Sequence, residues 1–187
     1  MRKNQKLVTQ AQNLSASDLN QFLADVKLNY SFEILHASQL SNDFQRQILE
    51  LFETNMKSSY EQSKDGYNQQ EKSDELFSDQ ARYLLILSAR DIIAYAHFRF
   101  DMDYGRQVVY LYELQVNGNY QSQGLGQWIM EQLKKICERT QMSKIVLTVQ
   151  KLNVKAIDFY MKKCQFEPDS TDPSDEDVDY RILSFSV

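Results

Sequence analysis

Apolar residues along the chain follow two spacings, which predict alternating strands and helices. Residues 83–88 and 92–100 are nearly continuous apolar runs on either side of a polar turn at residues 89–91, a pattern that predicts a β-hairpin. Residues 107–116, rich in Val, Leu and Tyr, extend the hairpin after the turn at Tyr104-Gly105. Three consecutive antiparallel strands are therefore expected in the middle of the chain.

Other segments complete this alternation. The residue pattern typical of a strand also occurs at residues 32–37, 144–149 and 180–185. Helical spacing recurs at four places, with Ser41 or Asn42 as a candidate cap for the second: residues 18–26, 40–52, 128–137 and 156–160. Residues 1–13 are polar and are expected to be loose, whereas residues 55–78 predict a surface helix or a loop over a site.

This order of elements defines the expected fold class. Adjacent antiparallel strands followed by β-α-β-α-β predict a mixed α+β domain with flanking helices. A chain of 187 residues with 42% hydrophobic content is long enough for one sizeable core. Residues 1–30 are expected to form a helical segment that packs on a single domain of residues 31–187, since no repeat or linker is visible.

A glycine-rich turn joins the strand at residues 107–116 to the helix that follows. Gly124 and Gly126 fall where the first unpaired amides of that helix point outward, a position that favours a pyrophosphate. A P-loop would need Lys and Ser or Thr in place of Gln127 and Trp128, and a dinucleotide fingerprint would need glycine in place of Ile129. The turn therefore predicts a phosphate site of another kind.

Composition narrows the classes of function. A net charge of -5 argues against sequence-independent nucleic-acid binding and suits a basic partner. The two cysteines, Cys137 and Cys164, form no disulfide framework, as in a reduced intracellular protein. His36 and His97 lie in strand-like runs and are expected to be packed or hydrogen-bonded, so no metal site is predicted. The first thirteen residues lack the apolar core of a signal peptide, and no membrane partner is expected.

Two motifs carry a resemblance to a known family. The run Q-S-Q-G-L-G at residues 121–126 resembles the acetyl-coenzyme A signature Q-x-x-G-x-G of the GNAT acyltransferases. The run N-V-K-A-I-D-F-Y at residues 153–160 resembles the GNAT pattern N-x-x-A-x-x-F-Y, although Gln165-Phe166 replaces the usual Gly-Phe that ends it. The order of predicted elements is the one that the GNAT fold requires.

Four further stretches resemble one GNAT branch, the NatD N-terminal acetyltransferases of histones. They are T-N-M-K-S-S-Y-E-Q-S at residues 54–63, A-H-F-R-F-D at 96–101, V-Y-L-Y-E-L-Q at 109–115 and L-T-V-Q-K-L-N at 147–153. The resemblance spans about residues 50–187, and the chain departs from it at Asp65, where an aromatic residue is expected.

The resemblance implies an activity and its partners. Acetyl would pass from acetyl-coenzyme A, in a ternary complex, to the N-terminal amine of Ser in the Ser-Gly-Arg-Gly tails of histones H-four and H-two-A. A monomer in the cytoplasm and nucleus is expected, with the ribosome as a further candidate partner.

The resemblance also assigns catalytic candidates. A terminal amine has a pKa of about 8 and must lose a proton before it attacks a thioester. Glu113, in an apolar strand, is the candidate base, directly or through water; the alternative is an edge carboxylate that faces solvent. Tyr110 and Tyr112 beside it are further catalytic candidates and are expected to form walls of the peptide entrance. Tyr160 matches the position of the acid for the thiolate, and the alternative is simple packing of an aromatic pair.

The remaining candidates divide between cofactor and peptide. The backbone of the strand end, the turn and a later asparagine would hold acetyl-coenzyme A: Leu114, Gln115, Val116, Gln121, Ser122, Gln123, Gly124, Leu125, Gly126, Gln127 and Asn153. The peptide would contact Tyr60, Asp101, Asp103, Tyr112, Glu113, Thr148, Thr171 and Tyr180. Asp101 is expected to pair with the arginine of the tail, and the acidic run at residues 169–179 either attracts the tail or is simply a solvated loop.

Three other functions remain open from the sequence. The same cofactor motif would serve an acetyltransferase of another small amine or peptide. It would also serve a noncatalytic acyl-coenzyme A binding module. The acidic run alone would suit a noncatalytic protein that holds histones.

Overall fold

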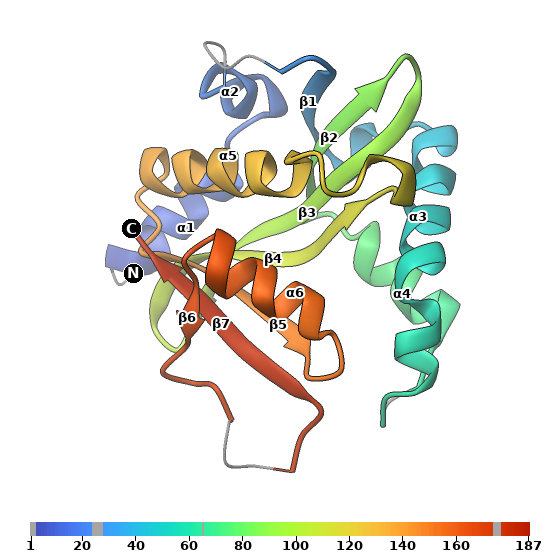
Figure 1. Cartoon of the computed structure of the whole chain (residues 1–187). Coiled ribbons are helices and arrows are strands. Elements are labelled where there is room, and N and C mark those ends of the chain that lie inside the picture. The colour runs from blue at the N-terminus through green and yellow to red at the C-terminus, as the bar shows by residue number, and fades with distance from the viewer. Residues whose placement is uncertain (1–2, 24–27, 65, 174–176) are drawn as a thin grey trace.

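A single twisted sheet of seven strands forms the centre of the computed structural model, which describes residues 3–23, 28–64, 66–173 and 177–187 (Figure 1). The strand order is β1-β2-β3-β4-β5-β7-β6, and every pair is antiparallel except β4 with β5. The strands are β1 (Ser31–His36), β2 (Arg82–Ser88), β3 (Asp91–Asp103), β4 (Arg106–Val116), β5 (Lys144–Gln150), β6 (Glu167–Pro168) and β7 (Tyr180–Ser186). The predicted mixed fold is confirmed, and among the strands of the described residues the two-residue β6 is the one that the sequence does not predict.

Helices cover both faces of the sheet (Figure 1). One face carries α1 (Lys3–Gln12), α2 (Ala16–Gln21), α5 (Leu125–Arg139) and α6 (Val154–Asp158), with α6 continued by the π-helical turn η3 (Phe159–Lys163). The other face carries α3 (Asn42–Glu61) and α4 (Gln69–Leu76). Short 3-10 turns are η1 (Ala37–Gln39) and η2 (Gly118–Tyr120). Within the described ranges, no helix is both long and apolar enough to cross a membrane.

The central hairpin forms as the apolar pattern predicts. Strands β2 and β3 turn at Ala89, which has a positive φ of 57°. Strands β3 and β4 turn at Tyr104 and Gly105, also with positive φ. Ser41 caps α3 by accepting a hydrogen bond from the Phe44 amide, as one of the two predicted caps.

The prediction that residues 1–13 are loose is wrong. Within this stretch, Lys3–Gln12 form α1, in which Val8 and Ala11, three positions apart, are buried against the sheet. The Gln12 amide donates a hydrogen bond to the Phe100 carbonyl, which ties the helix to β3. The polar composition of this stretch gives no signal for an amphipathic helix, because two small apolar residues are enough to pack the helix on the sheet. The next predicted helix, at residues 18–26, begins earlier as α2, and Val26 lies outside the described residues.

The polar stretch at residues 55–78 contains two helices. Helix α3 continues to Glu61, and α4 follows after a short connection. Lys72 and Leu76 of α4 are buried, so this segment is more than a solvated surface helix. The buried lysine is the first sign that α4 belongs to a site.

Strands β4 and β5 pair only at one end. Their parallel register runs from Val108 with Lys144 to Leu111 with Leu147 and then stops, although β4 extends to Val116. The second half of β4 therefore has β3 on one side and no strand of the described sheet on the other. This divergence opens a gap in the middle of the sheet, between the two halves of the domain.

The docking of the N-terminal segment can be tested by substitution of Leu19, which is fully buried in α2. Leu19→Ala should lower the free energy of unfolding by about 2–5 kcal/mol, because it deletes packed methyl groups from the common core. Ser17→Ala, exposed on the same helix, should change it by less than about 0.5 kcal/mol. Urea denaturation measures both, and equal small effects would show that the segment does not contribute to the core.

Candidate active site

A β-bulge in β4 places two functional candidates on the same face of the sheet. Phe98 pairs with Leu111 and His97 pairs with Glu113, so Tyr112 is an extra residue in the ladder. In a regular strand, consecutive side chains point to opposite faces. Here Tyr112 stacks on His97 and Glu113 reaches Lys72 of α4, so both side chains lie on the α3 and α4 side. The alternation of apolar residues in the sequence gives no sign of this bulge.

Glu113 is buried and paired, which excludes the reading that it is a solvent-facing edge carboxylate. Its side chain is 6% exposed, and its Oε1 lies 2.6 Å from Lys72 Nζ. Its Oε2 accepts a hydrogen bond from Gln115 Nε2 at 2.8 Å. Asn55 of α3 in turn donates to Gln115 Oε1 at 2.9 Å. Helices α3 and α4 together therefore fix the orientation of this carboxylate.

Burial and charge act in opposite directions on this pair. Burial raises the pKa of Glu113 above its ordinary value, although the Lys72 ammonium and the Gln115 amide favour the carboxylate. Burial alone would lower the pKa of Lys72, but Glu113, Tyr60 and Glu75 hold that pKa above its ordinary value. Lys72 also lies over the rings of Phe52 and Tyr60, at 4.5 and 5.2 Å from their centroids. An ammonium in this enclosure remains charged.

A stack of three rings and a guanidinium holds Tyr112 in place. His97 lies between Tyr83 and Tyr112, with ring centroids 5.2 and 4.9 Å away. The Arg99 guanidinium lies 4.1 Å from the Tyr112 centroid and donates through Nη2 to the carbonyl of Glu75. Burial lowers the pKa of His97 to about 2, so this histidine is neutral and packed, as the sequence predicts.

A cavity of about 290 Å³ opens on this face between the connection after α3, helix α4 and the start of β7. Its lining includes Tyr60, Tyr67, Lys72, Glu75, Thr148 and Tyr180. Three of the predicted peptide contacts, Tyr60, Thr148 and Tyr180, therefore meet in one cavity although they come from distant segments. Burial raises the pKa of Tyr60 to about 12, so its hydroxyl remains a hydrogen-bond donor. Tyr110 lies beside this group, with its hydroxyl 2.8 Å from Thr148 Oγ1.

The glycine-rich turn presents free amides, as predicted. Gly124 is the N-cap of α5 with a φ of 85°, a conformation that favours glycine. Trp128 is the first residue whose amide bonds back into the turn, to Gly124. Among the described residues, the amides of Leu125, Gly126 and Gln127 have no hydrogen-bond partner. A row of unpaired amides at a helix N-terminus fits a pyrophosphate.

Gly126 has a second reason to lack a side chain. A Cβ atom there would lie 3.2 Å from Cζ of Phe159 and 3.9 Å from Cδ2 of Leu114. The sequence places Gly126 among the amides that favour a pyrophosphate, and the structure shows that packing of the α6 segment against the start of α5 also requires a residue without a side chain there. The two motifs of the family resemblance thus touch each other through Gly126 and Phe159.

Several other cofactor candidates make contacts within the protein. Asn153 caps α6 by accepting from the Ala156 amide at 3.2 Å. Gln121 donates to the Val116 carbonyl and Gln123 to the Asn119 carbonyl, which braces the turn against the end of β4. Ser122 has a positive φ of 60° in the same exposed turn. These side chains shape the turn and leave its backbone to meet a ligand.

The two acidic candidates on β3, Asp101 and Asp103, have different surroundings. Asp101 is half-buried on β3 and accepts a hydrogen bond from the Met102 amide at 2.7 Å. Asp103 is paired with Lys144 at 3.0 Å, and Asp169 approaches the same ammonium at 2.6 Å. Thr171 donates twice to Asp169, through its amide and its hydroxyl. Asp103 and Thr171 thus belong to a network around Lys144 and do not line the cavity.

The acidic run is not simply a solvated loop. Asp169 is buried on Lys144, and Asp172 binds Arg181 Nε at 2.7 Å. Residues 174–176 of the run, like Asp65, lie outside the described residues. Its last carboxylate, Asp179, lines the cavity and accepts a hydrogen bond from the Lys64 amide. Part of the run therefore anchors the segment between β6 and β7, and part borders the cavity.

Tyr160 packs as a core residue. It is 8% exposed, stacks edge-on against Phe159 and contacts Phe166. Burial raises the pKa of its hydroxyl well above the ordinary value, which makes it a weak acid. The packing alternative accounts for its position, and its predicted role as proton donor stays a prediction.

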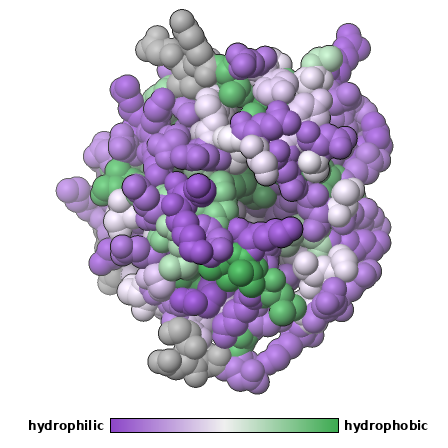
Figure 2. Space-filling model, viewed as in Figure 1, coloured by the Kyte–Doolittle hydropathy of each residue, from purple (hydrophilic) through white to green (hydrophobic). Residues whose placement is uncertain are grey.

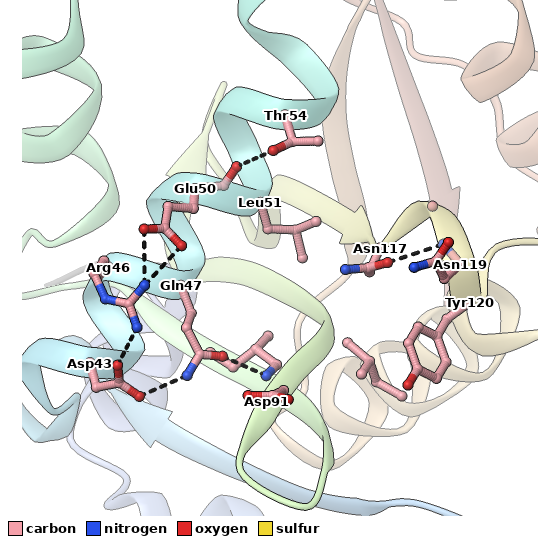
Figure 3. A pocket seen from close by; sticks show the side chains of 13 residues that line it. Asp43, Arg46, Gln47, Glu50, Leu51, Thr54, Asp91, Asn117, Asn119 and Tyr120 are labelled. Atoms are coloured by element: carbon pink, nitrogen blue, oxygen red, sulfur yellow. Dashed lines mark hydrogen bonds and ion pairs between the residues drawn. The ribbon is translucent and has the colours of Figure 1, made fainter.

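A larger groove of about 860 Å³ lies beside α3 and the ends of β3 and β4 (Figure 3). Its charged groups pair with one another, since Arg46 binds both Asp43 and Glu50. Gln47 accepts from the Ile92 amide, and Asn117 accepts from the Asn119 amide. The charged groups that α3 contributes to this groove are therefore bonded to one another.

The gap between β4 and β5 leads to a hollow on the molecular surface. Figure 2 shows that the middle of this face is hollowed, with apolar surface on its floor and below it. Leu152 and Val154, at the start of α6, are 69% and 62% exposed. The free amides of α5 and the cavity lined by Lys72 therefore lie on the two sides of the divergence of β4 and β5.

The chain belongs to the acetyltransferase (GNAT) family, whose sequence pattern it matches over residues 46–166. This match covers more than half of the chain and includes α3, α4, the bulged β4, the glycine-rich turn and α6. The free amides, the diverging strands and the family match agree on an acyltransferase site at this place in the fold.

Solved structures share the fold at low sequence identity. Arabidopsis thaliana Naa50, in complex with the bisubstrate analogue CoA-Ac-MVNAL, is 23% identical with a TM-score of 0.58, over 84% of this chain and 99% of that one. PaiA N-acetyltransferase from Thermoplasma acidophilum, in complex with coenzyme A, is 17% identical with a TM-score of 0.61, over 84% and 99%. Ard1 from Thermoplasma volcanium is 16% identical with a TM-score of 0.57, over 83% and 97%.

The contact between Gly126 and Phe159 can be tested with acetyl-coenzyme A. Gly126→Val should lower the free energy of unfolding by about 1–3 kcal/mol, because the new side chain overlaps Phe159. It should also weaken acetyl-coenzyme A about tenfold, or about 1.4 kcal/mol, because the start of α5 must shift.

Gly118→Ala is the matched control in the same connection, since a Cβ atom there has no neighbour within 4 Å. Thermal denaturation and calorimetric titration measure the two quantities. A folded Gly126→Val protein with unchanged affinity for acetyl-coenzyme A would remove the turn from the cofactor site.

Proposed function

We propose that this chain is an N-terminal acetyltransferase of the NatD type. It would transfer acetyl from acetyl-coenzyme A to the N-terminal amine of Ser in the Ser-Gly-Arg-Gly tails of histones H-four and H-two-A. The observation that carries the proposal is the cavity lined by Lys72, the partner of Glu113, in which tyrosines and carboxylates from α3, α4 and the start of β7 meet Thr148 and Gln150 of β5. The sequence resemblance to NatD enzymes supports the choice within the family.

The residues present fit acetyl-coenzyme A. The unpaired amides of Leu125, Gly126 and Gln127 suit its pyrophosphate, and the edge of β4 at Leu114, beyond the pairing with β5, suits the amides of its pantetheine arm. The Val116 carbonyl already accepts hydrogen bonds from Gln121 and Asn55. When bound, it supplies the activated acetyl group. These contacts leave the face that carries Tyr112 and Glu113 for the second reactant.

The cavity suits a short peptide with a positively charged end. Glu71, Glu75 and Asp179 line it, and Lys72 is the cation among the lining residues. Because carboxylates outnumber cations, an ammonium is attracted to it. The Tyr60 hydroxyl and Thr148 offer hydrogen bonds to the first peptide units, and a volume of about 290 Å³ has room for a small first residue such as Ser.

Mass spectrometry tests the proposal. The protein is incubated with acetyl-coenzyme A and Ser-Gly-Arg-Gly peptide, and fragmentation locates the acetyl group. We expect a gain on the N-terminal amine and none on a peptide whose N-terminus is already blocked. Acetylation of a free polyamine or aminoglycoside in preference to the peptide would contradict the proposal and favour a small-amine acetyltransferase.

Selectivity for the third residue of the tail can be tested at Asp101. Asp101→Asn should weaken the Ser-Gly-Arg-Gly peptide by about 1.5–3 kcal/mol, the range for a hydrogen bond between charged groups. The same change should cost far less for a Ser-Gly-Ala-Gly peptide, because no guanidinium is present. The ratio of kcat/KM for the two peptides measures the effect, and equal losses would show that Asp101 does not bind the arginine.

A further inference from the structure

Lys72 binds a second carboxylate besides Glu113. Glu75, on the last turn of α4, places its Oε1 2.5 Å from Lys72 Nζ, and Glu113 Oε1 lies 2.6 Å from the same nitrogen. The Tyr60 hydroxyl completes the group at 3.5 Å. One buried ammonium therefore joins a carboxylate of helix α4 to a carboxylate of strand β4.

The two carboxylates differ in their access to the cavity. The Glu113 side chain is 6% exposed, and both of its oxygens are held, by Lys72 and by Gln115. The Glu75 side chain is 38% exposed and lines the cavity, whereas Glu113 does not. A reactant in the cavity can therefore touch Glu75, while Glu113 reaches it only through Lys72.

The wall of the cavity around Glu75 carries more carboxylates than cations. Glu71, Glu75 and Asp179 line the cavity, and Lys72 is the cation among its lining residues. The other charged or titratable groups around Glu75 are Glu113, which shares the Lys72 ammonium, Arg99, which donates to the Glu75 carbonyl, and the hydroxyls of Tyr60, Tyr83, Tyr95 and Tyr112. An excess of carboxylates at a cavity wall favours the binding of one cation there.

We propose that Glu75 binds the ammonium of the incoming substrate and accepts its proton, with Lys72 and Glu113 as positioning residues that hold Glu75 in place. This role rests on the proposed function, since it needs an amine substrate in the cavity. It changes the assignment expected from the sequence, in which Glu113 acts on the amine itself.

The protons balance in this scheme. The substrate ammonium gives one proton to the Glu75 carboxylate, which frees the nitrogen lone pair. The nitrogen then forms a C–N bond with the acetyl carbonyl carbon as the C–S bond breaks. The nitrogen then loses a second proton, and one proton is taken up by the departing thiolate, so the products are an amide and a thiol. Glu75 returns its proton to solvent through its exposed side.

The test compares two carboxylates of the same helix. Glu75→Gln keeps the shape of the side chain but removes the proton acceptor. Asp74→Asn is the matched control, because Asp74 is exposed and accepts a hydrogen bond from the nearby Gln70 side chain. For both variants, kcat/KM is measured at pH 7 and at pH 9.5 with the N-terminal peptide that the wild type acetylates fastest, and thermal denaturation reports the fold.

We expect Glu75→Gln to lower kcat/KM about 100-fold at pH 7, the scale of general base catalysis. The loss should fall below about tenfold at pH 9.5, because an N-terminal amine with a pKa of about 8 is already neutral there. Asp74→Asn should stay within about twofold of the wild type at both pH values. Glu75→Asp, which keeps the carboxylate, should recover part of the activity.

Two results would overturn the role of Glu75 alone. One is a Glu75→Gln variant that matches Asp74→Asn while the wild type acetylates its peptide. The other is an equal loss at both pH values, which indicates a structural effect. A wild type that acetylates no N-terminal peptide would instead remove the proposed function, and the role of Glu75 with it.

Discussion

The buried pair of Lys72 and Glu113 is the interaction on which the candidate site depends. Neither charge could lie in this interior alone, because the desolvation of an unpaired charge costs several kcal/mol. The bulge at Tyr112 turns Glu113 toward α4, and the ammonium of Lys72, 2.6 Å away, fixes where α4 docks. The same docking of α4 brings the Glu75 carboxylate and the Tyr60 hydroxyl next to Lys72 Nζ.

The candidate site combines rigid and open parts. Tyr112 is held between His97 and Arg99, and Gln115 is held by Asn55, so the end of β4 has little freedom. The edge of β4 toward β5 is open beyond Leu111, and the amides at the start of α5 are free. Groups that shape the site are thus bonded within the protein, whereas backbone groups suited to a cofactor remain available.

Local patterns predict much of this fold but little of the charge network. The hairpin strands, the Ser41 cap and the turn before α5 follow from spacing and turn chemistry near in sequence. Helix α1 escapes prediction because two buried residues are too few to give a periodic signal. In the sequence, Lys72 and Glu75 look like solvated charges on a helix. Lys72 also binds Glu113, which is about forty residues away in the sequence, and only the tertiary fold brings these three side chains together.

A double-mutant cycle on Lys72 and Glu113 tests the central claim most directly. Lys72→Met and Glu113→Gln, alone and together, are compared by urea denaturation. If the pair is buried and mutually dependent, each single change should lower the free energy of unfolding by about 3–5 kcal/mol, and the double variant should lose less than the sum by about 2–3 kcal/mol. Losses that add within about 0.5 kcal/mol would show that the two charges do not depend on each other, and would contradict this account of the site.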